Sequence, residues 1–296
     1  MRDINQFTIT QAVKDSFKTE PGSRLETLLQ GLIEHLHDYT REMNLTHEEW
    51  MGVLTFLYDC GQISTPERHE FILLSDVLGF SMLVDAINNR RPDGATENTV
   101  FGPFHVAGAP VREMGETISL DGKGESCRFE GRILDLDGKP IEGARIDVWS
   151  DNADGFYSVQ QPDAQPKWNN RGIFLTGPDG AYHFTGIKPV SYPIPEDGPV
   201  GAMLKALGRH PWRPAHMHFL ITAPGFEKLV THTFVEGDPY LTSDAVFGVK
   251  ESLVAPFERI DGDTLWLDGE KIRLVNIDAP EVNGRCRAER VRAATA

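Results

Sequence analysis

The feature that most constrains the fold is a series of short segments, between about residues 115 and 250, in which apolar and polar residues alternate. The clearest segments are 127–138, 144–150, 181–187, 215–223 and 229–237. Turn-forming residues separate them, and Asp137-Gly138 at the end of the first segment predicts a hairpin. Many short strands at this spacing, without a strand–helix–strand rhythm, predict a mostly β protein with an antiparallel β-sandwich.

The first 90 or so residues have helical spacing instead. Within residues 23–43, leucine and isoleucine side chains recur at steps of three and four, which predicts one apolar stripe on a helix. Ser23 followed by Glu26, and Thr46 followed by Glu49, have the spacing of a capping box at a helix start. A third helix is predicted through residues 66–89. An α-helical N-terminal domain therefore precedes the strands.

The charge balance limits the classes of function. The chain of 296 residues has 29 Lys and Arg against 44 Asp and Glu, a net charge of −15, which argues against a nucleic-acid partner. Three cysteines are too few for a disulfide framework. The chain shows no signal peptide at its start and no long apolar run, so we expect a cytoplasmic protein with no membrane association.

His216-Met217-His218 is the most informative local motif. Residues two apart on a strand point to the same face, so the two imidazoles are expected side by side. Paired imidazoles suit a first-row transition metal. A motif this short is also common on polar strand faces, so by itself it leaves open two unrelated histidines.

Two tyrosines and an arginine lie in unusual positions. Tyr157 is in an irregular stretch directly after the segment 144–150, and prolines flank Tyr192. Taken singly, each tyrosine is better explained as a core aromatic residue with a satisfied hydroxyl. Arg213 lies just upstream of the two histidines, where a surface ion pair is the alternative interpretation.

In their order along the chain, these segments resemble the intradiol ring-cleaving dioxygenases. The resemblance is carried by GRILDLDGKPIEGARIDVWSDNADGFYS, NNRGIFLTGPDGAYHFTGIKPVSYPIPEDGP and GRHPWRPAHMHF, and it covers roughly residues 10–257. The hydroxyquinol branch is most similar, through LLSDVLGFSMLVD, ATENTVFGPFHV and GDPYLTSDAVFGVK. The resemblance implies cleavage of hydroxyquinol (1,2,4-trihydroxybenzene) by O2 to 3-hydroxy-cis,cis-muconate, which tautomerises to maleylacetate. Catechol and chlorocatechol are the alternative substrates.

The resemblance also implies a cofactor, one non-haem Fe(III) per subunit. Its ligands would be Tyr157, Tyr192, His216 and His218. The implied catalytic residues are Tyr192, which would accept a substrate proton, and Arg213, which would stabilise negative charge on the ring. His232 stands where many catechol enzymes have a glutamine near the ring.

The substrate pocket implied by the resemblance has mostly apolar and proline walls, which suit a flat aromatic ring. Its residues would be Leu73, Asp76, Val100, Phe101, Gly102, Pro103, Phe104, Ile194, Pro195, Arg213, His232 and Val246. The Asp76 carboxylate is expected to accept a hydrogen bond from the third hydroxyl of hydroxyquinol, which favours hydroxyquinol over catechol. The alternative is that Asp76 pairs within its own helix.

The predicted domains are residues 1–95, helical and dimerising; 96–257, the β-sandwich with the Fe(III) site; and 258–296, a tail. The resemblance implies a homodimer through the N-terminal helices, with a phospholipid possible at the interface. The tail resembles the start of a staphylococcal-nuclease-like domain, whose functional residues would fall on Asp263, Arg273, Asp278 and Glu281. Less than half of that domain is present, so we expect no nuclease activity.

Two functions from other classes remain as alternatives. The segment LDLDGKPIEGARIDVW also resembles prealbumin-like β-sandwich binding modules, which have no activity. A ferric tyrosinate colour would exclude such a module. A nuclease would be revealed by calcium-dependent DNA cleavage.

Overall fold

The computed structural model describes residues 2–65, 68–259 and 270–278. The chain divides into two compact units, one ending at Asp59 and one beginning at Cys60. The functional residues predicted from the sequence all lie in the second unit, apart from those of the tail that fall outside the described residues. The predicted domain limits of 1–95, 96–257 and 258–296 stay a prediction.

Two of the three predicted helices form as expected. They are α2 (Arg24–Glu42) and α3 (His47–Ile63), and a short helix α1 (Ile9–Asp15) precedes them. The Ser23 hydroxyl accepts a hydrogen bond from the Glu26 backbone N–H at 3.3 Å. At the start of α3 the capping box is complete, because the Thr46 and Glu49 side chains each accept from the other residue's backbone N–H.

The prediction of one helix over residues 66–89 was wrong. Two helices lie there, α4 (Glu70–Val77) and α5 (Phe80–Asn88). Gly79 separates them. Its φ of +72° is a left-handed conformation, which ends α4, and glycine occupies this position because residues with a Cβ rarely adopt that conformation. The break turns the chain between two apolar segments whose spacing alone looks continuous.

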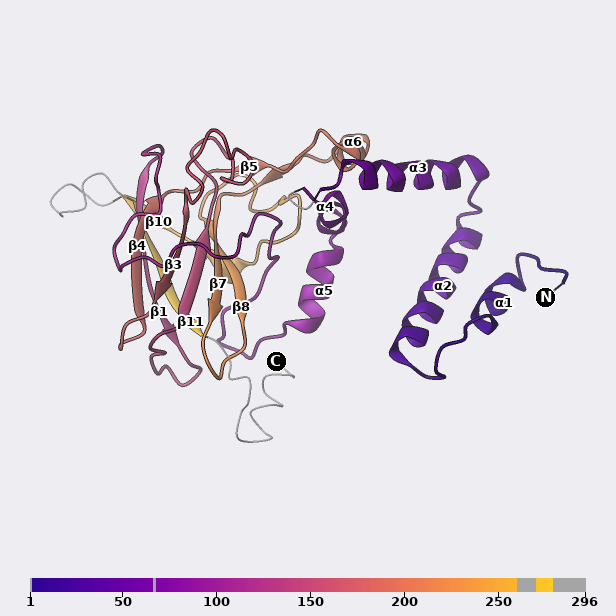
Figure 1. Ribbon diagram of the computed structural model, residues 1–296, viewed down its shortest axis with the longest axis horizontal. Coiled ribbons are helices and arrows are strands. Elements are labelled where there is room, and N and C mark those ends of the chain that lie inside the picture. Colours follow the sequence, from indigo (N-terminus) through magenta and orange to yellow (C-terminus); the bar gives the residue numbers. More distant parts are fainter. Residues whose placement is uncertain (1, 66–67, 260–269, 279–296) are drawn as a thin grey trace. The chain divides into compact units, whose positions relative to one another are not determined.

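The strands of the second unit form two main sheets (Figure 1). The first has the order β3-β2-β7-β8-β9, from β2 (Arg145–Trp149), β3 (Arg171–Leu175), β7 (His216–Thr222), β8 (Leu229–Val235) and β9 (Val254–Ala255). The second has the order β10-β11-β1-β4, from β1 (Ser126–Leu134), β4 (Ala181–Ile187), β10 (Phe257–Arg259) and β11 (Glu270–Asp278). Most neighbours are antiparallel, but β9 runs parallel to β8 and β11 parallel to β1.

One apolar core joins the two sheets. Phe129 on β1 and Phe184 on β4 come from one sheet, and Val148 on β2 and Phe219 on β7 come from the other. All four are 0% exposed. Strands β1, β2, β4 and β7 contribute alternate residues to this core, which is the reason for the period-two pattern in the sequence. The strand β3 was not predicted from the sequence, because four of its five residues are buried and it lacks alternation.

The hairpin predicted at Asp137-Gly138 forms, but it is short. Gly138 N–H donates to the Asp135 carbonyl at 2.9 Å, and after the turn Pro140 forms an antiparallel bridge with Leu134 at the end of β1. The chain then crosses to the other sheet, so β2 does not pair with β1, and the neighbours of β1 are β4 and β11. A turn motif identifies where the chain reverses but not which sheet receives it.

Four short elements complete the surroundings of the predicted site. Strands β5 (Tyr192–Pro193) and β6 (Trp212–Arg213) pair with each other, and helix α6 (Pro199–Ala206) lies between them in sequence. A 3-10 helix, η1 (Glu251–Leu253), precedes β9. The β5–β6 pairing places Tyr192 directly opposite Arg213.

Candidate active site

The two predicted histidines lie side by side on β7. His216 and His218 share one face of the strand, as residues two apart must, and both are 1% exposed. Their Nε2 atoms are 3.2 Å apart. His216 Nδ1 lies 2.7 Å from the Pro214 carbonyl, which can only accept, so Nδ1 carries the proton and Nε2 presents a lone pair.

The two predicted tyrosines come from other parts of the chain, and their hydroxyl groups meet beside the two histidines. The Tyr157 hydroxyl is 2.9 Å from His218 Nε2 and 3.5 Å from the Tyr192 hydroxyl. Tyr157 comes from the irregular stretch after β2, whereas Tyr192 lies on β5. The structure therefore brings the four predicted ligands together in one buried cluster.

Local contacts hold the Tyr157 segment in place. The Asn152 carboxamide accepts hydrogen bonds from the backbone N–H groups of Asp154 and Phe156, both at 3.0 Å, and forms an Asx-type turn. The Tyr157 N–H donates to the Gln160 side chain at 2.8 Å. The segment is thus shaped by its own polar side chains rather than by a helix or sheet.

Burial controls the charge of the four clustered side chains. It lowers the pKa of His216 to about 3 and the pKa of His218 well below the usual range. It raises the pKa of both Tyr157 and Tyr192, and at Tyr192 the Arg213 guanidinium opposes this increase. The imidazoles are therefore neutral with available lone pairs, and the phenols require a nearby cation to ionise. This donor set fits a metal cation.

A third histidine adjoins the cluster. His232 on β8 is 1% exposed, and neither of its ring nitrogens has a hydrogen-bond partner. One ring nitrogen of each of His216, His218 and His232 lies within 4.8 Å of the others. Its predicted role at the substrate ring stays a prediction.

Arg213 is buried beside the cluster, 2% exposed. Its Nη1 lies 3.4 Å from the Tyr192 hydroxyl and 3.3 Å from His216 Nε2. Its other two nitrogens are bound by Asp244, a residue that the sequence analysis missed because a single aspartate in a loop carries no motif. The guanidinium therefore belongs to the buried site and not to the surface.

A small cavity of about 20 Å³ lies between Arg213, Tyr192 and helix α4. Ten of the predicted substrate residues line it: Leu73, Asp76, Val100, Gly102, Pro103, Phe104, Ile194, Pro195, Arg213 and Val246. Asp76 is 6% exposed, and burial raises its pKa while the Ser81 side chain and Arg213 oppose the change.

Phe101 does not line this cavity. Phe101 is 41% exposed, and its ring lies against the rings of His105 and Trp149, at centroid distances of 4.8 and 5.6 Å. Trp149 in turn stacks on His218 at 4.6 Å. Phe101 thus contacts the cluster through Trp149, and its predicted contact with substrate stays a prediction.

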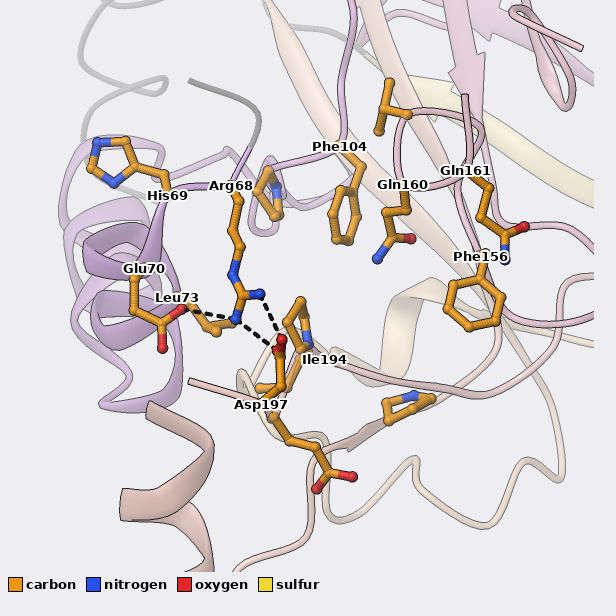
Figure 2. A pocket seen from close by; sticks show the side chains of 15 residues that line it. Arg68, His69, Glu70, Leu73, Phe104, Phe156, Gln160, Gln161, Ile194 and Asp197 are labelled. Carbon is orange, nitrogen blue, oxygen red and sulfur yellow. Dashed lines mark hydrogen bonds and ion pairs between the residues drawn. The ribbon is translucent and has the colours of Figure 1, made fainter. Parts of the chain in front are cut away.

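A larger cavity of about 610 Å³ adjoins the small one. The two share the wall residues Leu73, Pro103, Phe104, Ile194 and Pro195. Figure 2 shows Arg68 on one side of the larger cavity, reaching to Glu70 and Asp197, and Phe156 and Gln161 on the other side. Arg68 binds both Asp197 oxygens, at 2.9 and 2.7 Å. The larger cavity is large enough to hold an aromatic ring, and it shares a wall with the small cavity beside Tyr192 and Arg213.

Two family profiles match the chain. Residues 100–274 match the family described as Dioxygenase, and residues 22–96 match the family described as Catechol dioxygenase N terminus. The chain belongs to the intradiol ring-cleavage dioxygenases, a family of enzymes, as its sequence motifs predicted. The match reaches residue 274, beyond the end of the resemblance at residue 257.

Several relatives are hydroxyquinol enzymes. Hydroxyquinol 1,2-dioxygenase of Rhizobium sp. (strain MTP-10005) is 57% identical over 80% of this chain and 81% of its own length. 6-chlorohydroxyquinol 1,2-dioxygenase of Cupriavidus pinatubonensis is 48% identical over 90% of this chain and 97% of its own length. The crystal structure of hydroxyquinol 1,2-dioxygenase from Pseudomonas putida DLL-E4 superimposes with a TM-score of 0.85 at 47% identity, covering 93% of this chain and 98% of that one.

A catechol enzyme is more distant. The crystal structure of catechol 1,2-dioxygenase from Acinetobacter radioresistens superimposes with a TM-score of 0.82 at 30% identity, and the match covers 94% of both chains.

Across the described part of the chain, no helix has the length and apolar character needed to cross a membrane.

Proposed function

We propose that this protein cleaves hydroxyquinol between its two adjacent hydroxyl-bearing carbons, with O2, to 3-hydroxy-cis,cis-muconate and its tautomer maleylacetate. The observation that carries the proposal is the buried cluster of Tyr157, Tyr192, His216 and His218 beside a cavity that contains Asp76. The hydroxyquinol enzymes among the relatives support the choice of ring.

The proposed cofactor is Fe(III), held by the two tyrosines and the two histidines. Ferric iron is a hard, highly charged ion, so two phenolate oxygens together with neutral imidazoles suit it. When bound, it supplies a Lewis acid that binds the adjacent hydroxyls of the ring and makes the ring reactive toward O2.

The protein's own groups supply proton transfer, charge stabilisation and orientation. The Tyr192 oxygen is the proposed acceptor of a substrate proton, and Arg213 at 3.4 Å stabilises the negative charge that develops beside it. Phe104 and Ile194 bound the ring with apolar surface and keep water from the reacting atoms. Phe104 also stacks on Tyr157, at a centroid distance of 4.6 Å, so one apolar wall is continuous with the metal cluster.

Oxygen uptake by iron-loaded protein should be fastest with hydroxyquinol. We expect kcat/KM for hydroxyquinol to exceed those for catechol and 4-chlorocatechol by about 10-fold or more, since only hydroxyquinol offers Asp76 a third hydroxyl. The measurement is an oxygen electrode trace with each substrate, together with identification of the product. Higher kcat/KM with catechol or a chlorocatechol would assign the protein to that alternative, and no oxygen uptake with any of the three would reject the proposal.

The proposal includes a β-sandwich catalytic domain and a homodimer built on the N-terminal helices, with a phospholipid chain at the interface. The core shared by the two sheets supports the sandwich. The exposed leucines of α2 support the dimer, because an apolar stripe open to water favours a covering partner.

Light scattering after size-exclusion chromatography should give twice the 33.0 kDa mass of the chain. Leu28→Glu combined with Leu32→Glu should shift the protein toward monomer, because both side chains are exposed on the α2 stripe. Leu207→Glu, an exposed leucine after α6, is the matched control and should remain dimeric. A stable, active wild-type monomer would contradict the dimer.

We further propose that the tail, 258–296, has no nuclease function. Asp263 and Glu281 lie outside the described residues. Arg273 and Asp278 belong to β11, which pairs with β1 of the dioxygenase sheet. This use of the segment as a dioxygenase strand supports a structural role for it.

A further inference from the structure

The carboxylate of Asp244 is the most fully bonded buried acid near the site. It is 5% exposed and lies in the connection between β8 and η1. Oδ1 accepts from Arg213 Nε at 3.0 Å and from the Val246 N–H at 3.2 Å. Oδ2 accepts from Arg213 Nη2 at 3.2 Å and from the Gly248 N–H at 2.9 Å. Both oxygens are therefore fixed by two donors each.

These hydrogen bonds use two of the three guanidinium nitrogens of Arg213 and leave the third for the site. Asp244 takes the edge formed by Nε and Nη2 in a bidentate pair. The remaining nitrogen, Nη1, is left to face the Tyr192 hydroxyl at 3.4 Å and His216 Nε2 at 3.3 Å. Because the guanidinium is rigid and planar, holding one edge determines where Nη1 points.

The space around the pair permits little rearrangement. A Cβ at position 248 would lie 3.0 Å from Arg213 Nη2 and 3.2 Å from Asp244 Oδ2, so only glycine fits without displacing them. Thr99 donates to the Gly248 carbonyl at 2.5 Å and fixes the backbone there. The loop of residues 244–248 is thus packed closely around the Arg213–Asp244 ion pair.

The electrostatics favour the same geometry. Burial would raise the pKa of Asp244, but Arg213, His216 and the Gly248 N–H together outweigh burial and lower it. Asp76 is the second acid that faces Arg213. Without the Asp244 charge, Asp76 would be the remaining carboxyl group beside the guanidinium, and the bidentate contact that fixes its orientation would be lost.

We infer that Asp244 is a positioning residue that acts through Arg213: by holding one edge of the guanidinium, it directs Nη1 at the Tyr192 oxygen and the reacting ring. The inference rests on the proposed function. It adds a residue in the β8–η1 connection that touches neither substrate nor metal cluster and yet sets the geometry of the charge that stabilises the reaction.

The test is a double-mutant cycle of Asp244→Asn and Arg213→Gln. We expect Asp244→Asn to lower kcat for hydroxyquinol by about 10- to 100-fold with little change in KM, since misplacement by about 1 Å has effects of this size. In the Arg213→Gln background, the same change should lower kcat less than about twofold, because residues that act as a unit are not additive. Glu227→Gln, which removes a carboxylate from the Arg91 pair away from the site, is the matched control and should keep wild-type kcat.

Two further readouts keep the inference testable if Asp244→Asn folds poorly or if hydroxyquinol is not the substrate. Arg213→Lys retains the charge but cannot bind Asp244 with one edge and Tyr192 with another, so it should lose kcat to a similar extent. In a crystal structure of metal-free Asp244→Asn, Arg213 Nη1 should lie more than about 4 Å from the Tyr192 oxygen, beyond hydrogen-bond distance. Equal losses of kcat in both backgrounds, wild-type kcat in Arg213→Lys, or an unmoved guanidinium would each overturn the inference. Wild-type protein inactive on all the diols would instead reject the proposed function and leave the structural readout to decide the role of Asp244.

Discussion

Replacement of His218 by alanine is expected to abolish iron binding, visible colour and ring cleavage together. His218 Nε2 lies at the centre of the cluster, 3.2 Å from His216 Nε2 and 2.9 Å from the Tyr157 hydroxyl. Its removal leaves three donors and an open space in a fully buried site. Iron per chain can be measured by mass spectrometry, and tyrosinate bound to Fe(III) by its absorption in the visible range.

The matched control is His183→Ala. His183 is partly buried on β4, in the other sheet, and should be replaceable with full iron content and colour. A His218→Ala protein that keeps one iron per chain and the wild-type spectrum would show that the metal is held elsewhere. Loss of colour with retained iron would indicate that the tyrosines alone are affected.

Asp76→Ala should remove most of the preference for hydroxyquinol over catechol. Ring cleavage requires only two adjacent hydroxyls, so the metal cluster cannot distinguish the two substrates and the choice depends on the pocket walls. Asp76 lines the small cavity together with Arg213. A hydrogen bond from the third hydroxyl to this acid contributes about 1–3 kcal/mol, equivalent to about 5- to 150-fold in the ratio of kcat/KM values.

The iron spectrum of Asp76→Ala should remain that of the wild type, since Asp76 is not one of the four clustered side chains. Asp85→Ala on α5, which removes a partly buried carboxylate bonded to Asn89, is the control for effects on the helices. An Asp76→Ala protein with the wild-type ratio of kcat/KM values would show that Asp76 serves only the structure of α4.

Some of the fold was predictable because its signals are local. The caps at Ser23 and Thr46 place the starts of two helices, since capping depends on residues three apart. Alternation identifies strands such as β1 and β7, since one face of each is in the core. The break at Gly79 was missed, because apolar spacing continues across it and only the backbone conformation reveals it.

The sequence by itself determined the family and predicted helices α2 and α3 and most of the strands, because these depend on short patterns and their order. Only the tertiary structure decided that Tyr157, Tyr192 and His218 meet, since 61 residues separate Tyr157 from His218. It also decided that Asp244 holds Arg213. These contacts depend on which sheet each strand joins and how the connections pack around it, and no local pattern carries that information.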